Sequence, residues 1–242
     1  NRGDRIAAPL MREGGRHLAT DWEPALARLA QLAGKGGKAV ILASASASFE
    51  SLAQLRALVG KASLTAAVQL PMADDEQPLT GIPGLALRRE RAANGDGARL
   101  LGYGTDWNAA VKAASGADLV LLLDVTLTDA EAALVSGAAA TVVLGTTLGQ
   151  ALPSAELVLP VTNVAEETGT FINRDQRVQR YQQARTGPGM ARPAWWVAAG
   201  AAGTDIGTAA EAFAAAAATV PAMAGLTYAD LGLNGRAAEP PS

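Results

Sequence analysis

Short apolar runs alternate with amphipathic stretches along the first seventy residues. The run Ala39–Leu42 is apolar and short enough to predict a buried strand, and a second strand is predicted at Leu64–Leu70. Between them, residues 49–59 place Leu52, Leu55, Leu58 and Val59 on one face, which predicts a helix. Residues 22–32 predict an earlier helix, which Asp21 can cap. A strand, a helix and a second strand in this order are typical of a parallel, right-handed unit.

The same alternation resumes after residue 100. Strands are predicted at Leu119–Leu123, Thr141–Leu144 and Leu157–Leu159, and helices at residues 106–114 and 129–135. Strands that alternate with helices indicate a parallel sheet covered by helices on both faces. The pattern therefore predicts an α/β protein built as two Rossmann-like lobes, followed by a helical C-terminal tail.

The segment between the two alternating regions has a different composition. It contains Pro71, Pro78 and Pro83, an acidic cluster at residues 74–76 and an Asn94-Gly95 pair, so an irregular linker with at most a short helix is expected. The predicted organisation follows from these boundaries. It consists of a first α/β lobe with its N-terminal segment (1–70), a linker (71–99), a second α/β lobe (100–190) and a helical C-terminal segment (191–242).

Charge and hydropathy limit the classes of partner. The formal net charge is −3 and no long basic run is present, so neither nucleic acid nor an anionic membrane surface is an expected partner. No apolar run approaches the roughly 20 residues that a membrane-spanning helix requires. We therefore expect no direct insertion into a membrane.

The composition also limits metal chemistry. The chain has no cysteine and one histidine, His17. Iron–sulfur clusters are held mainly by four cysteine thiolates, so this chain alone cannot ligate an ordinary cluster. A zinc site would have to use carboxylates almost exclusively. We predict no metal site in the chain, and for His17 a surface or partner-facing position.

The segment 157–179 joins an apolar strand to a charged region that is rich in turn residues. After Pro160, the pair Glu166 and Glu167 is followed by Thr168-Gly169-Thr170. Gly169 allows either a positive φ or a close approach by another group, so a sharp bend is expected there. Asn173 favours a further turn through its side chain.

The two glutamates are the only acid–base pair in this segment that merits consideration. Adjacent residues of an extended segment point in opposite directions, so Glu166 and Glu167 are a poor cooperating pair. The preferred interpretation is that they fix the loop by hydrogen bonds or pair with Arg177. No catalytic residue is assigned.

These segments resemble the molybdopterin oxidoreductase superfamily. The segment 157–179 matches a family pattern that consists of a strand ending in Leu-Pro, a glutamate-containing loop, a GTFxN turn and an RxQ element. Residues 191–195 match the family's xRPxW pattern. Residues 102–124 match the helix and strand that precede the segment 157–179 in the family. Residues 4–12 and 22–26 match the family's N-terminal pattern. Within the superfamily, the resemblance is greatest to the C-terminal domain of the large iron–sulfur subunit of NADH-quinone oxidoreductase, respiratory complex I.

This resemblance implies a structural, subunit-docking role in electron transfer from NADH to quinone. No cofactor is expected in this chain, whereas iron–sulfur clusters and FMN are expected elsewhere in the complex. The implied partners are the cluster-bearing and flavin-bearing subunits. The implied location is the peripheral arm, on the cytoplasmic side of the bacterial inner membrane or the matrix side of the mitochondrial one.

Two alternatives remain open. One is a molybdopterin-dependent oxidoreductase such as a formate dehydrogenase, and the other is a small nucleotide-binding α/β module. In the molybdenum enzymes of the superfamily the glutamate-containing loop lies close to the pterin. If a pterin is bound, the resemblance implies contacts from six positions: Glu167, Gly169, Thr170, Asn173, Arg177 and Gln179.

Overall fold

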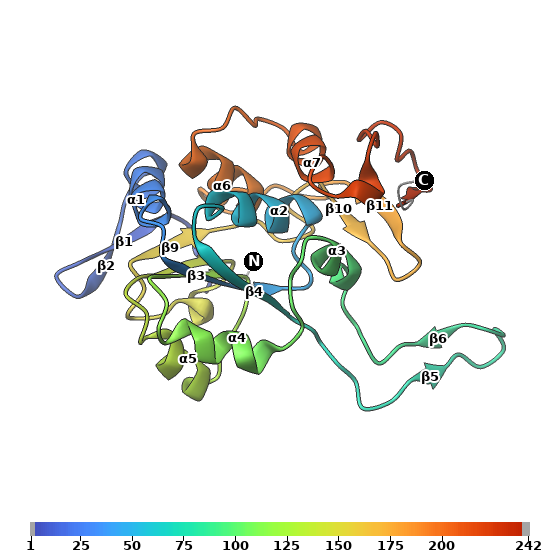
Figure 1. Cartoon of the computed structure of the whole chain (residues 1–242), viewed down its shortest axis with the longest axis horizontal. Coiled ribbons are helices and arrows are strands. Elements are labelled where there is room, and N and C mark those ends of the chain that lie inside the picture. Colours follow the sequence, from blue (N-terminus) through green and yellow to red (C-terminus); the bar gives the residue numbers. More distant parts are fainter. Residues whose placement is uncertain (1–2, 239–242) are drawn as a thin grey trace.

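The computed structural model describes residues 3–238 and is organised around one seven-stranded sheet (Figure 1). Five strands are parallel, and their order across the sheet is β9-β8-β7-β3-β4. The antiparallel hairpin of β1 and β2 extends the sheet beyond β9. The strands are β1 (Leu10–Glu13), β2 (Arg16–Ala19), β3 (Lys38–Ser44), β4 (Ser63–Gln69), β7 (Leu119–Leu123), β8 (Thr141–Gly145) and β9 (Leu157–Pro160).

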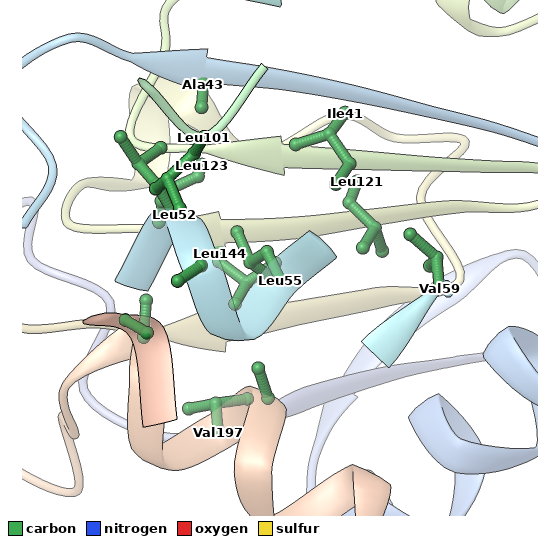
Figure 2. Packing of buried hydrophobic residues seen from close by; sticks show 14 of the residues in the cluster. Ile41, Ala43, Leu52, Leu55, Val59, Leu101, Leu121, Leu123, Leu144 and Val197 are labelled. Carbon is green, nitrogen blue, oxygen red and sulfur yellow. The ribbon is translucent and has the colours of Figure 1, made fainter. Parts of the chain in front are cut away.

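Helices cover both faces of this sheet, as Figure 1 shows. One face carries α1 (Trp22–Gly34), α2 (Phe49–Leu58), α6 (Ala194–Ala202) and α7 (Ala209–Ala217). The opposite face carries α4 (Trp107–Ala114) and α5 (Asp129–Val135). Side chains of successive strand residues point to opposite faces, so Leu121 and Leu122 belong to different cores. Figure 2 shows Leu144 beside Leu55 of α2.

Local sequence signals fix where these helices begin. The hydroxyl of Ser48 accepts a hydrogen bond from the backbone N–H of Ser51 at the start of α2. Thr128 and Glu131 form a reciprocal capping box at the start of α5. Such caps satisfy backbone N–H groups that have no partner inside the helix. The predicted starts at residues 49 and 129 are thereby confirmed; the helix predicted at residue 22 also begins there, but the predicted cap by Asp21 is wrong, because its side chain makes no capping hydrogen bond.

The segment predicted as an irregular linker forms an arm that extends away from the body (Figure 1). Two very short strands, β5 (Gln77–Pro78) and β6 (Ala86–Leu87), pair along it, and α3 (Gly95–Leu100) returns the chain to the body. Five large apolar side chains of the arm are exposed: Met72, Leu79, Ile82, Leu85 and Leu87.

A second, three-stranded sheet lies beside α2 and α7. It consists of the antiparallel hairpin of β10 (Gly169–Ile172) and β11 (Arg177–Tyr181), with β12 (Arg236–Ala237) added at its edge. Two 3₁₀ turns complete the regular structure, at Leu148–Gln150 and Pro221–Met223.

The predicted α/β class with a mainly parallel, helix-covered sheet is confirmed. The division into two lobes needs correction, because the strands of 1–70 and 100–190 lie side by side in a single sheet. The contact is made by β3 and β7, which pair along their whole length. Both strands are apolar on both faces, so joining them buries more surface than two separate sheets would.

The C-terminal segment begins with the predicted helices α6 and α7 and then adds β12 to the small sheet. The last four positions of the predicted segment 191–242 lie outside the described residues. Within residues 3–238, no helix combines the length and apolar character needed to cross a bilayer.

Candidate functional site

The carboxyl ends of the parallel strands meet at one edge of the sheet. The chain leaves β3 toward β4 on one side, and later returns through β7 on the other side of β3. Loops that follow β3 and β7 therefore diverge at this switch point, the position at which α/β sheets generally bind their ligands. The polar residues Ser44, Asp124, Thr146 and Thr162 stand at or just beyond the ends of β3, β7, β8 and β9.

Asp124 is held in an unusual conformation at this edge. Its φ of 49° lies in the left-handed region, which few residues other than glycine adopt. Its Oδ1 accepts hydrogen bonds from Thr146 Oγ1 (3.0 Å) and Gln150 Nε2 (2.9 Å). Among the described residues, no hydrogen bond reaches its Oδ2. One carboxylate oxygen is thus available at the switch point.

Glu166 forms an ion-pair network beside this edge. Arg5 donates to both of its oxygens at 2.7 Å, and Arg185 donates to Oε1 at 2.5 Å. The Glu166 side chain is fully buried. Burial acts to raise its pKa, but the bonds from Arg5 and Arg185 outweigh it and lower the pKa to about 2. Glu166 therefore stays charged and joins the N-terminal segment to the loop after β9.

Its neighbour Glu167 has the opposite environment. Its oxygens accept hydrogen bonds from Thr162 Oγ1 (2.8 Å) and Tyr181 Oη (2.9 Å), both of which are neutral. Burial raises the pKa of Glu167 to about 7. The two side chains bind different partners, as expected for adjacent residues, and the predicted loop-fixing role is confirmed for both.

A third acidic side chain, Glu50 of α2, was not anticipated from the sequence. Glu50 is fully buried and accepts hydrogen bonds from the backbone N–H (3.0 Å) and the hydroxyl (2.9 Å) of Thr170. Burial raises its pKa to about 8. The signal that could have revealed it is a glutamate at a position of α2 where its neighbours Phe49 and Leu52 are core residues.

The six positions implied by the resemblance do not form one pocket. Glu167, Gly169 and Thr170 are buried against the first turn of α2. Gly169 has no positive φ; a Cβ there would lie 2.7 Å from Tyr181 Oη and 2.9 Å from Ser48 Cβ, so the glycine permits a close approach. Asn173, Arg177 and Gln179 lie farther out along the hairpin, Asn173 and Arg177 at its turn and Gln179 in β11 opposite Phe171.

The outer three positions have contacts within the chain. Asn173 Oδ1 accepts from the backbone N–H groups of Asp175 and Arg177, which confirms the predicted turn. The prediction that a glutamate pairs with Arg177 is wrong. Arg177 instead donates to the carbonyl oxygens of Asn234 and Gly235, and the cations on Glu166 are Arg5 and Arg185. Arg5 is distant in sequence, so no local spacing indicated it.

A cleft of about 330 Å³ opens next to Glu167. It is bordered by the loops after β9 and β11 and by the start of α7, with Thr162, Glu167, Arg192, Trp195 and Thr208 in its walls. The indole Nε1 of Trp195 is buried and has no hydrogen-bond partner among the described residues. His17 lies elsewhere, on β2, where its Nε2 is 2.8 Å from the carbonyl oxygen of Ala155.

The carboxyl edge of the sheet presents polar groups that can form hydrogen bonds. Within residues 3–238, no three His, Cys, Asp or Glu side chains are grouped as metal ligands. The edge instead offers the free Oδ2 of Asp124 and the partly exposed hydroxyl-bearing residues Ser44 and Thr146. Such groups can exchange hydrogen bonds with a polar organic ligand.

Comparisons with known proteins agree with this architecture. The family model described as molybdopterin oxidoreductase matches residues 76–200, just over half of the chain. The "F420-dependent formate dehydrogenase 2 subunit alpha" of Methanococcus maripaludis is 36% identical over 88 residues, which are 34% of this chain and 13% of that protein. The "Putative formate dehydrogenase YrhE" of Bacillus subtilis (strain 168) is 49% identical over 43 residues, which are 18% of this chain and 4% of that protein.

The matched stretches span only a small part of these two relatives. The family match, by contrast, begins in the arm, continues through β7, β8 and β9, and ends within α6. It therefore includes Asp124, both glutamates of the loop after β9 and the whole β10–β11 hairpin. On this basis the chain belongs to the molybdopterin oxidoreductase family.

Proposed function

We propose that this chain is the α/β domain of a molybdopterin-dependent oxidoreductase of the formate dehydrogenase type. The proposal assigns to it the binding of part of the pterin cofactor at the carboxyl edge of the sheet. The observation that carries the proposal is Asp124, held at the β3/β7 switch point with Oδ2 free. The names of both relatives contain "formate dehydrogenase", which supports this assignment over complex I.

In this assignment the residues of the chain bind and orient. Asp124 Oδ2 would accept a hydrogen bond from the cofactor when it is bound, and Thr146 and Gln150 fix the direction of the carboxylate. The Arg5–Glu166–Arg185 network keeps the loop after β9 rigid beside it. The pterin-bound metal, when present, supplies the two-electron exchange with the substrate.

Two matched variants test the assignment. Asp124 follows the last residue of β7, whereas Asp118 precedes its first residue at the opposite edge and accepts from the backbone N–H of Lys38 (2.7 Å). The full-length protein would be purified from a host that makes molybdopterin, and its pterin content measured by fluorescence after oxidative release.

We expect Asp124→Ala to lower the pterin content at least about tenfold. The reason is that the variant loses one charged hydrogen bond, which contributes about 1.4 kcal/mol or more to binding. Asp118→Ala should leave the pterin content unchanged. Equal pterin content in the two variants, with both folded by circular dichroism, would contradict the proposed site.

A second candidate is the docking part of the large iron–sulfur subunit of NADH-quinone oxidoreductase, in the peripheral arm of respiratory complex I. The observations that favour it are the absence of cysteine and the exposed apolar side chains of the 71–90 arm, which suit contact with another polypeptide. This candidate predicts a protein without pterin that co-purifies with cluster-bearing and flavin-bearing subunits. The pterin measurement therefore separates the two candidates.

A further inference from the structure

The contact between α2 and the β10–β11 hairpin buries two carboxyl groups without a cation. Glu50 is 0% exposed and Glu167 is 6% exposed. Neither forms an ion pair among the described residues. The guanidinium groups of Arg5 and Arg185 pair with Glu166 instead. A buried carboxylate without a cation is strongly disfavoured, so such a group tends to keep its proton.

These carboxyl groups attach the hairpin to the body. Glu50 accepts both hydrogen bonds of Thr170, at the start of β10. Glu167 accepts from Tyr181 at the end of β11, the residue paired with Gly169. Gly169 itself lies against Ser48, the cap of α2. Glu50 therefore holds the start of β10 to α2, and Glu167 holds the end of β11 to Thr162 in the loop after β9.

The other titratable groups near the pair are acidic or neutral. Two tyrosines, Tyr181 and Tyr228, lie near Glu50, and Asp124 lies near Glu167. When both are charged, Glu50 and Glu167 also repel each other. The phenol oxygen of Tyr228 is buried without a hydrogen-bond partner among the described residues. No second negative charge can be accommodated here without a large repulsion in a medium of low dielectric constant.

The surrounding cations are engaged elsewhere. Arg5 and Arg185 bind Glu166, the guanidinium of Arg180 lies 5.6 Å from the centre of the Tyr228 ring, and α3 contributes Arg99, which binds Glu90 and Asp96. Arg192, in the wall of the cleft, lies over the ring of Trp196. The residues of α6 and α7 that enter this region, Trp195 and Phe213, are not titratable.

We propose that the β10–β11 hairpin is a proton-operated latch, closed on α2 while at least one of Glu50 and Glu167 is protonated and released when both are charged. Burial places the pKa values of Glu50 and Glu167 at about 8 and about 7, so release falls in the mildly alkaline range. This inference requires no cofactor and stands independently of the proposed function.

Release of the hairpin would also loosen the carboxyl edge of the sheet. Asn94 is fully buried and joins the two regions, since its Oδ1 accepts from Ile172 N–H of β10 and its Nδ2 donates to the carbonyl of Ala47, in the loop after β3. Movement of β10 removes one of these bonds. The latch thereby connects local pH with the order of the switch-point loop.

Two backbone amides report directly on the latch. The N–H of Thr170 donates to Glu50 and that of Ile172 donates to Asn94, so their hydrogen exchange measures opening of the hairpin. Exchange of the full chain would be followed by NMR from about pH 6 to about pH 9 and corrected for intrinsic rates. We expect the protection of both amides to fall at least about tenfold, while the amides of β7 and β8 keep theirs.

The matched variants are Glu50→Gln and Glu156→Gln. The amide oxygen of glutamine still accepts from Thr170 but cannot become charged, so Glu50→Gln should keep the hairpin protected at about pH 9. Glu156 pairs with Arg28 far from the hairpin, and its substitution should leave the wild-type pH profile unchanged. If Glu50→Gln does not fold, Glu167→Gln makes the same test from the other acid.

Constant wild-type protection of Thr170 and Ile172 across this range would overturn the latch. The same conclusion would follow if the glutamine variant lost protection as steeply as the wild type. Loss of protection in β7 and β8 together with the hairpin would show global unfolding and would also overturn it.

Discussion

The centre of the parallel sheet and the seat of the β10–β11 hairpin are both buried, but they are held together differently. At the centre, β7 and β8 are buried along their whole length and bring leucine and valine to both faces. At the hairpin seat, the buried side chains include Glu50, Glu167 and Thr170. The first region depends on apolar area and shape, which pH does not alter. The second depends on hydrogen bonds and on protons, so its stability changes with conditions.

The largest change in the free energy of unfolding that separates the two regions is expected at the sheet centre. Leu144 of β8 is fully buried against α2, as Figure 2 shows with Leu55. Leu144→Ala removes buried apolar area and leaves a cavity, so we expect a loss of about 3 to 4 kcal/mol in the free energy of unfolding, independent of pH between about 5 and 9. Urea denaturation followed by circular dichroism measures this loss.

Leu85→Ala on the arm is the matched control, because Leu85 is 51% exposed. Leu85→Ala should lower the free energy of unfolding by less than about 0.5 kcal/mol. Equal losses for the two leucines would show that the arm is part of the folding core and would remove the distinction between the regions.

A somewhat smaller effect is expected at the ion-pair network. Arg5→Met keeps an apolar side chain but leaves Arg185 as the one cation bonded to the buried Glu166. We expect this substitution to lower the free energy of unfolding by about 3 kcal/mol at pH 7. Because Arg5 and Arg185 lower the folded pKa of Glu166 to about 2, this stabilisation is present above the ordinary glutamate pKa. It is lost as the pH falls toward about 2.

Urea denaturation at about pH 7 and about pH 4 tests this dependence, and the difference between Arg5→Met and wild type should narrow at the lower pH. Adding Glu166→Gln to Arg5→Met should recover part of the loss, because no charge is then left buried. A double variant that is less stable than Arg5→Met would show that Arg5 stabilises the fold mainly through the packing of its apolar stem and not through its charge.

The same contrast explains which features could be predicted from the sequence. The run Leu119–Leu123 and the stripe of Leu52 and Leu55 carry their periodicity locally, and the structure confirms both elements. The single sheet could not be deduced in the same way. Periodicity shows that β3 and β7 are buried but not that they are neighbours, and the arm between them gave the appearance of a domain boundary.

The polar site was less accessible to sequence reasoning. Glu166 meets Arg5 across 161 positions of sequence and Glu50 meets Thr170 across 120, so no local spacing indicates either contact. The resemblance directed attention to the loop after β9, and the pairing with Arg177 that was expected from the residues of this segment is wrong. Asp124 was not predicted, although an acid directly after a buried strand occupies the carboxyl edge of a parallel sheet and could have indicated it.

The pH dependence of stability provides a smaller test. For Glu50 and Glu167 the folded pKa lies above the ordinary value near 4.5, so the folded state binds more protons than the unfolded chain between about pH 4.5 and 8. Each such group makes the free energy of unfolding fall as the pH rises, by up to about 1.4 kcal/mol per pH unit. We expect Glu167→Gln to reduce the slope that urea titrations give between about pH 5 and 7.

The control for this slope is Glu156→Gln, whose partner Arg28 lies at the surface. Its slope should equal that of the wild type. A wild-type protein whose stability rises over the same range would contradict the assignment of raised pKa values to the two buried acids.

The smallest effect is expected at the tip of the arm, where Ile82 is 53% exposed. Ile82→Ser removes a side chain that is largely exposed in the isolated chain, so the free energy of unfolding should change by less than about 0.5 kcal/mol. The arm is held by the pairing of β5 with β6 and by the bridge between Met72 and Glu90, and the substitution alters none of these side chains. A larger loss in the isolated chain would mean that the tip packs in solution. An unchanged stability combined with weaker co-purification of another polypeptide would instead locate the function of these apolar residues in binding.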